Sequence, residues 1–212
     1  MDVAIAGGHG KIALHLERLL ADAGHRVRAL IRNPDHEDDV RAAGAEPVLC
    51  DIENLDDLAP CIQGADAVVF AAGAGPGSGP ERKKTVDRDG ALKLVDAARR
   101  VGARRYVIVS SIGADDPAGG PEQMRPYLEA KAEADRAVSE SGLDWTIVRP
   151  GSLTNDPGTG LVTVSEDMGL RGDIPREDVA RVVAAALGEA ATIGRTFVVV
   201  SGGTPVDQAV SG

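Results

Sequence analysis

Tyr127 and Lys131 stand four positions apart in the sequence, a spacing that places two side chains on one face of a helix. A free phenol has a pKa of about 10 and exchanges protons poorly at neutral pH. A neighbouring ammonium favours the phenolate and brings the group closer to working pH. Ser111, at the end of an expected strand, could hydrogen-bond a substrate carbonyl beside the tyrosine. The three residues predict acid–base chemistry on a carbonyl, and a surface tyrosine beside a solvated lysine is the alternative.

A second chemical signal is the glycine-rich turn near the start of the chain. The buried strand expected over Val3–Ala6 leads directly into Gly7-x-x-Gly10-x-x-Ala13, and a helix is expected over Lys11–Ala23. A strand, a glycine turn and a helix present backbone N–H groups and a positive helix end to a pyrophosphate. A tight turn without a ligand is the alternative. The expected cofactor contacts here are Gly7, Gly8, His9, Gly10, Lys11 and Ile12.

The end of the expected second strand, Arg26–Ile31, carries the sequence Arg32-Asn33-Pro34. In this arrangement a carboxylate would bind the ribose 2′-hydroxyl of NAD, whereas a cation would accept the 2′-phosphate of NADP. Arg32 can grip a phosphate with two hydrogen bonds, and Asn33 can assist it. We therefore expect NADP rather than NAD as cofactor, with a solvated loop arginine as the alternative.

Further candidates follow the later strands. Asp51 and Ile52 could contact adenine, and small residues after the fourth strand would let the backbone pass close to the cofactor. The histidines show no metal-ligand spacing, so we expect no metal site. The remaining expected cofactor contacts are Asp51, Ile52, Ala71, Ala72, Gly73, Ser110, Lys131, Pro150 and Gly151.

Composition limits the class of protein. The chain has 212 residues and a formal net charge of −10, which argues against partners with anionic surfaces such as nucleic acids and membranes. We expect no membrane span, and a small molecule as the ligand. Cys50 and Cys61 are too few for a disulfide framework, so we expect two buried thiols and a reducing cytoplasm. A monomer or a small homo-oligomer is expected.

The order of elements indicates the fold. Apolar strands alternate with helix-length segments, which predicts an α/β Rossmann fold: a doubly wound parallel sheet with helices on both faces. We expect residues 1–212 to form one domain, in which 151–175 and 190–212 contribute a small substrate-side lobe. Expected strands are Val3–Ala6, Arg26–Ile31, Glu46–Cys50, Ala67–Phe70, Tyr106–Val109, Trp145–Val148, Leu161–Val164 and Thr196–Val200; expected helices are Lys11–Ala23, His36–Ala43, Leu55–Ile62, Val86–Val101, Glu122–Ser141 and Arg176–Gly188.

Taken in this order, the glycine turn, Arg32, Asp51-Ile52, Ser110-Ser111, Tyr127-x-x-x-Lys131 and Arg149-Pro150-Gly151 resemble the atypical short-chain dehydrogenase/reductases. Within that group the chain is similar to small bacterial NAD(P)-binding proteins described as sugar-epimerase-like, NADH-flavin-reductase-like or NmrA-like. The resemblance implies a nicotinamide cofactor and Ser111, Tyr127 and Lys131 as the catalytic group, with Lys131 also binding the nicotinamide ribose. Ala13 replaces the family's usual third glycine.

Three functions are compatible with this sequence. The first is an NADP-dependent oxidoreductase that moves a hydride to or from a small carbonyl or quinone-like substrate with help from Tyr127 and Lys131. The second is an NAD(P)H-dependent flavin reductase in which the tyrosine has no catalytic role. The third is a regulatory protein that binds the dinucleotide without turnover. The presence of Tyr127 favours the first, because flavin reductases and dinucleotide sensors of the group often lack it.

Overall fold

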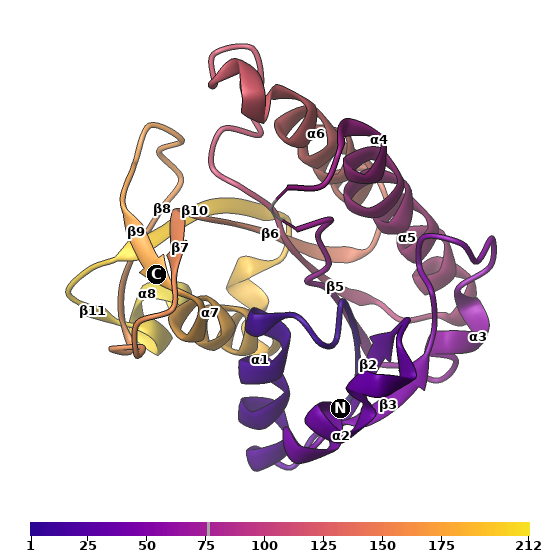
Figure 1. Ribbon diagram of the computed structural model, residues 1–212. Coiled ribbons are helices and arrows are strands. Elements are labelled where there is room, and N and C mark those ends of the chain that lie inside the picture. Colours follow the sequence, from indigo (N-terminus) through magenta and orange to yellow (C-terminus); the bar gives the residue numbers. More distant parts are fainter. Residues whose placement is uncertain (76) are drawn as a thin grey trace.

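The computed structural model describes residues 1–75 and 77–212, which fold around a nine-stranded sheet and a separate two-stranded one (Figure 1). The main sheet contains β1 (Asp2–Ala6), β2 (Arg26–Ile31), β3 (Glu46–Leu49), β4 (Ala67–Phe70), β5 (Arg105–Val109), β6 (Asp144–Pro150), β8 (Leu161–Ser165), β10 (Arg195–Ser201) and β11 (Thr204–Pro205). Its order is β3-β2-β1-β4-β5-β6-β10-β8-β11, and only β8 pairs antiparallel with its neighbours. Strands β7 (Ser152–Thr154) and β9 (Asp173–Pro175) form the small parallel sheet.

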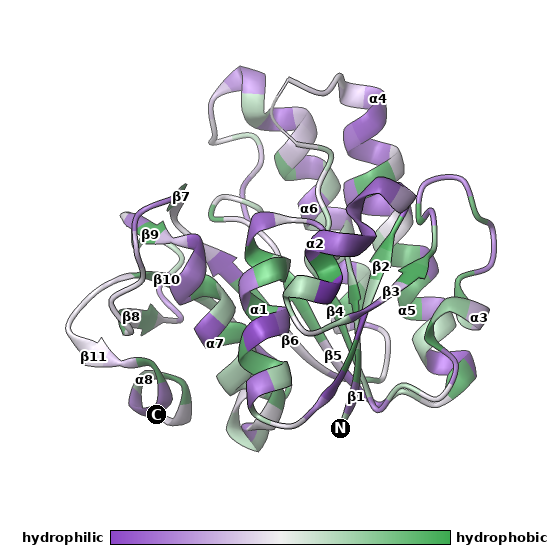
Figure 2. Ribbon diagram, turned by 60° about the horizontal axis from the view of Figure 1, so that its bottom comes forward, coloured by the Kyte–Doolittle hydropathy of each residue, from purple (hydrophilic) through white to green (hydrophobic). Residues whose placement is uncertain are grey.

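Helices cover both faces of the main sheet. They are α1 (Lys11–Asp22), α2 (Glu37–Ala42), α3 (Ala59–Ile62), α4 (Pro80–Arg82), α5 (Gly90–Val101), α6 (Arg125–Ser139), α7 (Arg176–Gly188) and α8 (Val206–Ser211), with a π-helical segment over Lys83–Asp89. Alternate strand residues supply two cores: Val3 and Ile5 pack with α1 and α7, whereas Ala4 and Ala6 pack with α3, α5 and α6. Figure 2 shows the central strands largely in hydrophobic green between helices of mixed colour. This arrangement confirms the predicted doubly wound Rossmann fold.

The strand order also predicts where a ligand binds. The chain winds outward from β1 through β2 and β3 on one side, and through β4, β5 and β6 on the other. Loops that follow β1 and β4 therefore diverge from each other, and a crevice opens at the carboxyl ends of these strands. The glycine turn and the segment Ala71–Ala74 lie at this point.

Two helices differ from the expectation. The helix expected over Leu55–Ile62 is confined to α3, whose first residue, Ala59, donates its N–H to the Asp57 side chain. The helix expected over Val86–Val101 is preceded by the π-helical segment, which begins at Lys83 and runs into α5. The strand expected over Thr196–Val200 is confirmed as β10, which pairs in parallel with β6 and so extends the main sheet. Within the described residues, no helix combines the length and apolar character needed to cross a membrane.

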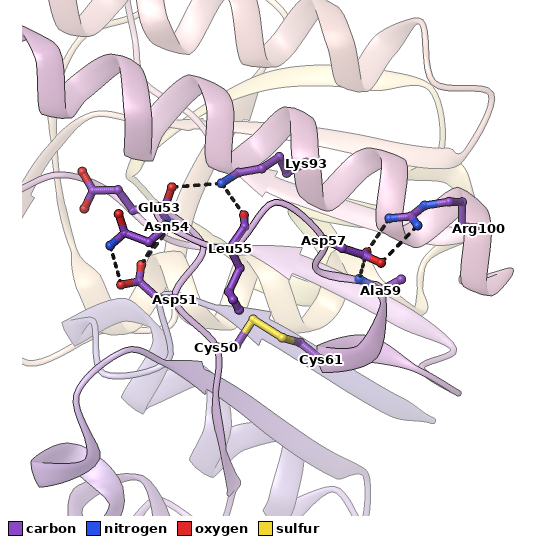
Figure 3. Close-up of a disulfide and its surroundings, with 10 residues drawn as sticks. All are labelled: Cys50, Asp51, Glu53, Asn54, Leu55, Asp57, Ala59, Cys61, Lys93 and Arg100. Carbon is purple, nitrogen blue, oxygen red and sulfur yellow. Dashed lines mark hydrogen bonds and ion pairs between the residues drawn. A yellow bond between two sulfur atoms is a disulfide. The ribbon is translucent and has the colours of Figure 1, made fainter.

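The expectation of two free thiols is wrong. Cys50 and Cys61 form a disulfide, with their Cα atoms 6.2 Å apart (Figure 3). Cys50 follows β3, and α3 brings Cys61 back beside it after an irregular loop. The pairing depends on the path of that loop, which has no periodic signal in the sequence.

Candidate functional site

A first cavity of about 300 Å³ opens at the carboxyl ends of β1, β2, β3 and β4. It lies at the crevice that the strand order predicts. Segments that follow all four strands line it, so residues far apart in the sequence meet there. The predicted cofactor residues that line this cavity are Gly7, Gly8, His9, Gly10, Arg32, Asp51, Ile52, Ala71, Ala72 and Gly73.

The glycine turn fits an anionic ligand. Gly7 has φ +80°, and a Cβ atom there would lie 2.6 Å from the Ala72 Cα atom. A Cβ atom on Gly8 would lie 2.6 Å from the Ala29 Cβ atom. Gly10 is the N-cap of α1, and no side chain in the described part of the chain caps the first turn of this helix. The N–H groups of that turn, which begins beside a residue that lines the cavity, suit a pyrophosphate.

Two arginines and one carboxylate surround the outer part of the first cavity. The Arg32 guanidinium lies 3.6 Å from the Glu53 carboxylate, and Arg82, from α4, approaches the same carboxylate at 3.4 Å. The Arg32 side chain is 54% exposed. Thr85 donates its hydroxyl hydrogen to Glu53 at 2.6 Å and holds that carboxylate in place. The cavity therefore has two cations near the expected 2′-phosphate position.

His36 also lines the first cavity, although the sequence analysis assigns it no contact with a ligand. Its ring stacks on that of His9, with centroids 3.6 Å apart and an angle of 14° between the planes. His9 in turn contacts the Asp39 carboxylate at 2.8 Å. The stack joins the glycine turn to the segment that follows β2.

Asp51 is held by its own loop. Its carboxylate accepts hydrogen bonds from the Asn54 side chain at 2.8 Å and from the N–H groups of Glu53 and Asn54 (Figure 3). Burial acts to raise the pKa of Asp51, but these hydrogen bonds outweigh it and hold the pKa below its ordinary value. The Asp51 carboxylate in the cavity wall is therefore ionised, and hydrogen bonds from its own loop already occupy part of its two oxygens.

Lys131 lies behind the first cavity in a fully buried position. Its Nζ atom donates to Val109 O at 3.2 Å and to Ala72 O at 3.5 Å, and lies 3.2 Å from an Asp87 carboxylate oxygen. Burial acts to lower the pKa of Lys131, but the charges of Tyr127 and Asp87 more than offset it, and the net pKa is raised. The lysine is therefore a fixed cation that contacts the segment after β4.

Tyr127 lies one turn before Lys131 on α6, and the Lys131 Nζ atom is 5.9 Å from the centre of its ring. The Tyr127 side chain is half-buried and does not line the first cavity. Lys83 approaches the same ring, also at 5.9 Å. Two cations therefore flank the phenol, one buried and one partly exposed.

A second cavity, of about 540 Å³, lies beyond the ends of β5 and β6. The residues that line it include Ser111, Pro150, Gly151 and Arg171, together with Met124, which directly precedes α6, and Leu128 in the first turn of α6. Ser111 donates its hydroxyl hydrogen to Ile112 O at 3.1 Å. The mixed apolar and polar lining, with the Ser111 hydroxyl in its wall, suits a small organic substrate.

Four predicted cofactor residues have other positions. Ile12 is buried in the core, and Asn33 accepts a hydrogen bond from Asp35 N–H. Lys11 points away from the first cavity and donates to the Asn155 side-chain oxygen at 3.2 Å. Ser110 donates to Asp135 at 2.8 Å.

The Asp135 carboxylate that receives Ser110 also accepts two hydrogen bonds from Arg149, at 3.0 and 3.1 Å. Burial raises the pKa of Asp135, although its hydrogen bonds with Arg149 and Ser110 act to lower it. This buried network ties α6 to the ends of β5 and β6. Ser110 and Arg149 thus position the elements around the second cavity.

Sequence reasoning missed Glu53, Arg82, Asp87 and His36. Glu53 directly follows the predicted Asp51-Ile52 pair, and its place after a strand was the available signal. Arg82 and Asp87 belong to the segment before α5. Nothing in the sequence indicates that this segment packs beside the first cavity. Only the packing of the π-helical segment against α6 reveals their position.

Comparison with known proteins assigns the chain to a family. The NAD(P)H-binding family model matches residues 7–190, and the chain belongs to this family. The uncharacterised sugar epimerase YhfK of Bacillus subtilis (strain 168) is 39% identical over 212 residues, covering 99% of each chain. A Bacillus halodurans structure assigned to the NAD-dependent epimerases/dehydratases has a TM-score of 0.95 at 41% identity, covering 99% of this chain and 98% of that one. The oxidoreductase ylbE of Lactococcus lactis has a TM-score of 0.88 at 25% identity, covering 99% and 95%.

Proposed function

We propose that this protein is an NADP-dependent oxidoreductase that moves a hydride to or from a small carbonyl or quinone-like substrate. The observation that carries the proposal is the position of Lys131, which contacts Ala72 of the first cavity and stands one helical turn from Tyr127. A dinucleotide in the first cavity and a substrate in the second would meet near this lysine.

Each group of residues around the two cavities has its own proposed role. The glycine turn and the first turn of α1 bind the pyrophosphate, Arg32 and Arg82 bind the 2′-phosphate, and Lys131 holds the nicotinamide ribose. The bound dinucleotide supplies or accepts the hydride. In the reductive direction Tyr127 donates its phenolic proton to the substrate oxygen, and Ser111 hydrogen-bonds that oxygen to orient it. The ammonium of Lys131 stabilises the phenolate that remains.

The preference for NADP is tested by titration with NADPH and NADH, followed by nicotinamide fluorescence. We expect NADPH to bind about tenfold or more tightly than NADH, and Arg32→Ala to remove that difference. Arg26→Ala is the matched control, since Arg26 lies at the opposite end of β2 with its side chain 63% exposed. Equal affinity of wild type and Arg32→Ala for NADPH would remove Arg32 from the proposed 2′-phosphate site.

The catalytic role is tested separately with Tyr127→Phe. We expect turnover to fall by about a hundredfold or more, as for the loss of a general acid, while NADPH affinity changes less than a few-fold. A variant that binds and turns over normally would exclude tyrosine-assisted chemistry.

A flavin reductase is the second candidate. Tyr127 lines neither cavity in the described part of the chain, which favours a reaction in which the substrate simply stacks on the nicotinamide. Full flavin reduction by Tyr127→Phe would support this candidate. Tight binding without turnover of any carbonyl, quinone or flavin would instead indicate a dinucleotide sensor.

A further inference from the structure

The Cys50–Cys61 disulfide lies in the wall of the first cavity. Cys50 itself lines the cavity, and the disulfide closes the loop from which Asp51, Ile52 and Glu53 also face it (Figure 3). A covalent bond therefore restricts the conformation of the part of the cavity wall that would contact the adenosine half of a dinucleotide.

Apart from the disulfide, side-chain contacts hold the loop between the two cysteines. Residues 51–58, all of them described, form neither helix nor strand. Lys93 of α5 donates to Glu53 O at 3.0 Å and to Leu55 O at 2.7 Å, and Arg100 pairs with Asp57 at the exposed end (Figure 3). Thr85 holds the Glu53 carboxylate and Asp51 caps its own turn, so every one of these contacts depends on a side chain and not on regular secondary structure. Reduction would thus leave this wall with a larger set of conformations.

The first cavity also gives a reductant access to the disulfide at Cys50. Cys50 is 3% exposed and Cys61 is 9% exposed, and both pack among apolar residues such as Leu58 and Ile62. Of the two, Cys50 is the one that lines the cavity. A dinucleotide bound there would cover the Cys50 side of the disulfide.

We propose that Cys50 and Cys61 are a redox-active pair whose state is coupled to dinucleotide binding, an inference that rests on the proposed dinucleotide site. A dithiol reductant attacks Cys50 Sγ through the first cavity, and Cys61 leaves as a thiolate. The second thiol of the reductant then releases Cys50. Two electrons and two protons pass to the two cysteines, and the reductant becomes a disulfide.

The oxidised form binds the dinucleotide more tightly, because the wall residues are already ordered. Affinities that differ by about tenfold lie within the usual range for coupled sites. The coupling is reciprocal, so saturating dinucleotide would lower the midpoint potential of the pair by about 30 mV for that tenfold difference.

The experiment uses the full chain in oxidised and in dithiothreitol-reduced form, with the state checked by thiol alkylation and intact mass. NADPH affinity is measured for both, and the rate of reduction is measured with and without NADPH. We expect about tenfold weaker binding after reduction and at least fivefold slower reduction in saturating NADPH. Cys61→Ser removes the disulfide but no sulfur that lines the cavity. This variant is expected to bind NADPH as weakly as the reduced wild type, with an affinity that dithiothreitol does not change.

Equal NADPH affinity of both forms, with a reduction rate that NADPH does not change, would overturn this inference and leave the proposed function intact. Absence of NADPH and NADH binding in both forms would overturn the proposed function as well. Circular dichroism of the reduced protein and of Cys61→Ser shows whether either has unfolded. The effect of NADPH on the rate at which the wild-type disulfide is reduced tests the coupling without any variant.

Discussion

The carboxylate of Asp87 and the ammonium of Lys131 form an ion pair at 3.2 Å, with 0% and 3% of the two side chains exposed. Asp87 also accepts a hydrogen bond from Ala74 N–H at 3.1 Å, in the segment that lines the first cavity. One buried carboxylate thus fixes both the proposed ribose-binding lysine and the cavity wall next to it. Asp87 acts through Lys131 and is a positioning residue.

Removing one partner of this pair is expected to be costly. Asp87→Asn and Lys131→Met each leave an unpaired buried charge, and each should lower the free energy of unfolding by about 3–5 kcal/mol. The double variant should lose less than the sum of the two, because it leaves no charge behind. Urea unfolding of the four proteins measures this coupling. Asp144→Asn, which breaks the exposed contact with Arg104, is the control and should cost less than about 1 kcal/mol. Strict additivity of the two buried changes would contradict the pairing.

Glu17 makes stability depend on pH. It is fully buried on α1, which packs against α7, and its carboxyl oxygens have no hydrogen-bond partner among the described residues. Burial raises the pKa of Glu17 from 4.5 to about 8. Between these values the folded protein holds a proton that the unfolded chain has lost, so this group makes stability fall as the pH rises, by at most about 1.4 kcal/mol per pH unit.

Glu17→Gln keeps a neutral side chain of the same size and removes this dependence. We expect the variant and the wild type to have similar stability near pH 5, and the variant to be more stable by about 3 kcal/mol at pH 8. Urea unfolding across that range is the measurement. Parallel stability curves for the two proteins would mean that Glu17 is ionised in the folded state.

Gly8 is expected to tolerate no larger residue. Alanine would place its Cβ atom 2.6 Å from the Ala29 Cβ atom and 2.9 Å from its Cα atom, so the glycine turn must move. Gly8→Ala should destabilise the protein by about 1–3 kcal/mol and weaken NADPH binding at least tenfold. Gly188→Ala, at the end of α7 with open space around it, is the matched control and should change neither. Unchanged binding by Gly8→Ala would argue that the turn does not hold the pyrophosphate.

The disulfide is expected to stabilise the fold as well as the cavity wall. Its two cysteines are separated by 11 positions, and closing a loop of this size contributes about 3 kcal/mol through the unfolded state. Dithiothreitol should therefore lower the free energy of unfolding of the wild type by about that amount. The stability of Cys61→Ser should not respond to it. A wild type that is equally stable with and without reductant would show that the bond adds no stability.

The sequence alone determined the features that depend on a residue's place after a strand. Apolar runs separated by helix-length segments predicted the doubly wound sheet, and the carboxyl ends of parallel strands meet at one edge. The predicted cofactor residues that follow these strands therefore line one cavity, as expected; among them are Gly7, Gly8, Arg32, Asp51 and Ala72. The helical spacing of Tyr127 and Lys131 fixed their common face in the same way. These relationships follow from local geometry.

The tertiary structure decided the contacts made across packed elements. Asp87 meets Lys131 because a π-helical segment packs against α6, and Glu53 lies between Arg32 and Arg82 because α4 returns to the cavity. Cys61 meets Cys50 through the path of an irregular loop, and Glu17 loses solvent where α1 and α7 pack together. Such contacts depend on how helices are rotated and how loops run in space. Periodicity along the chain carries no record of either.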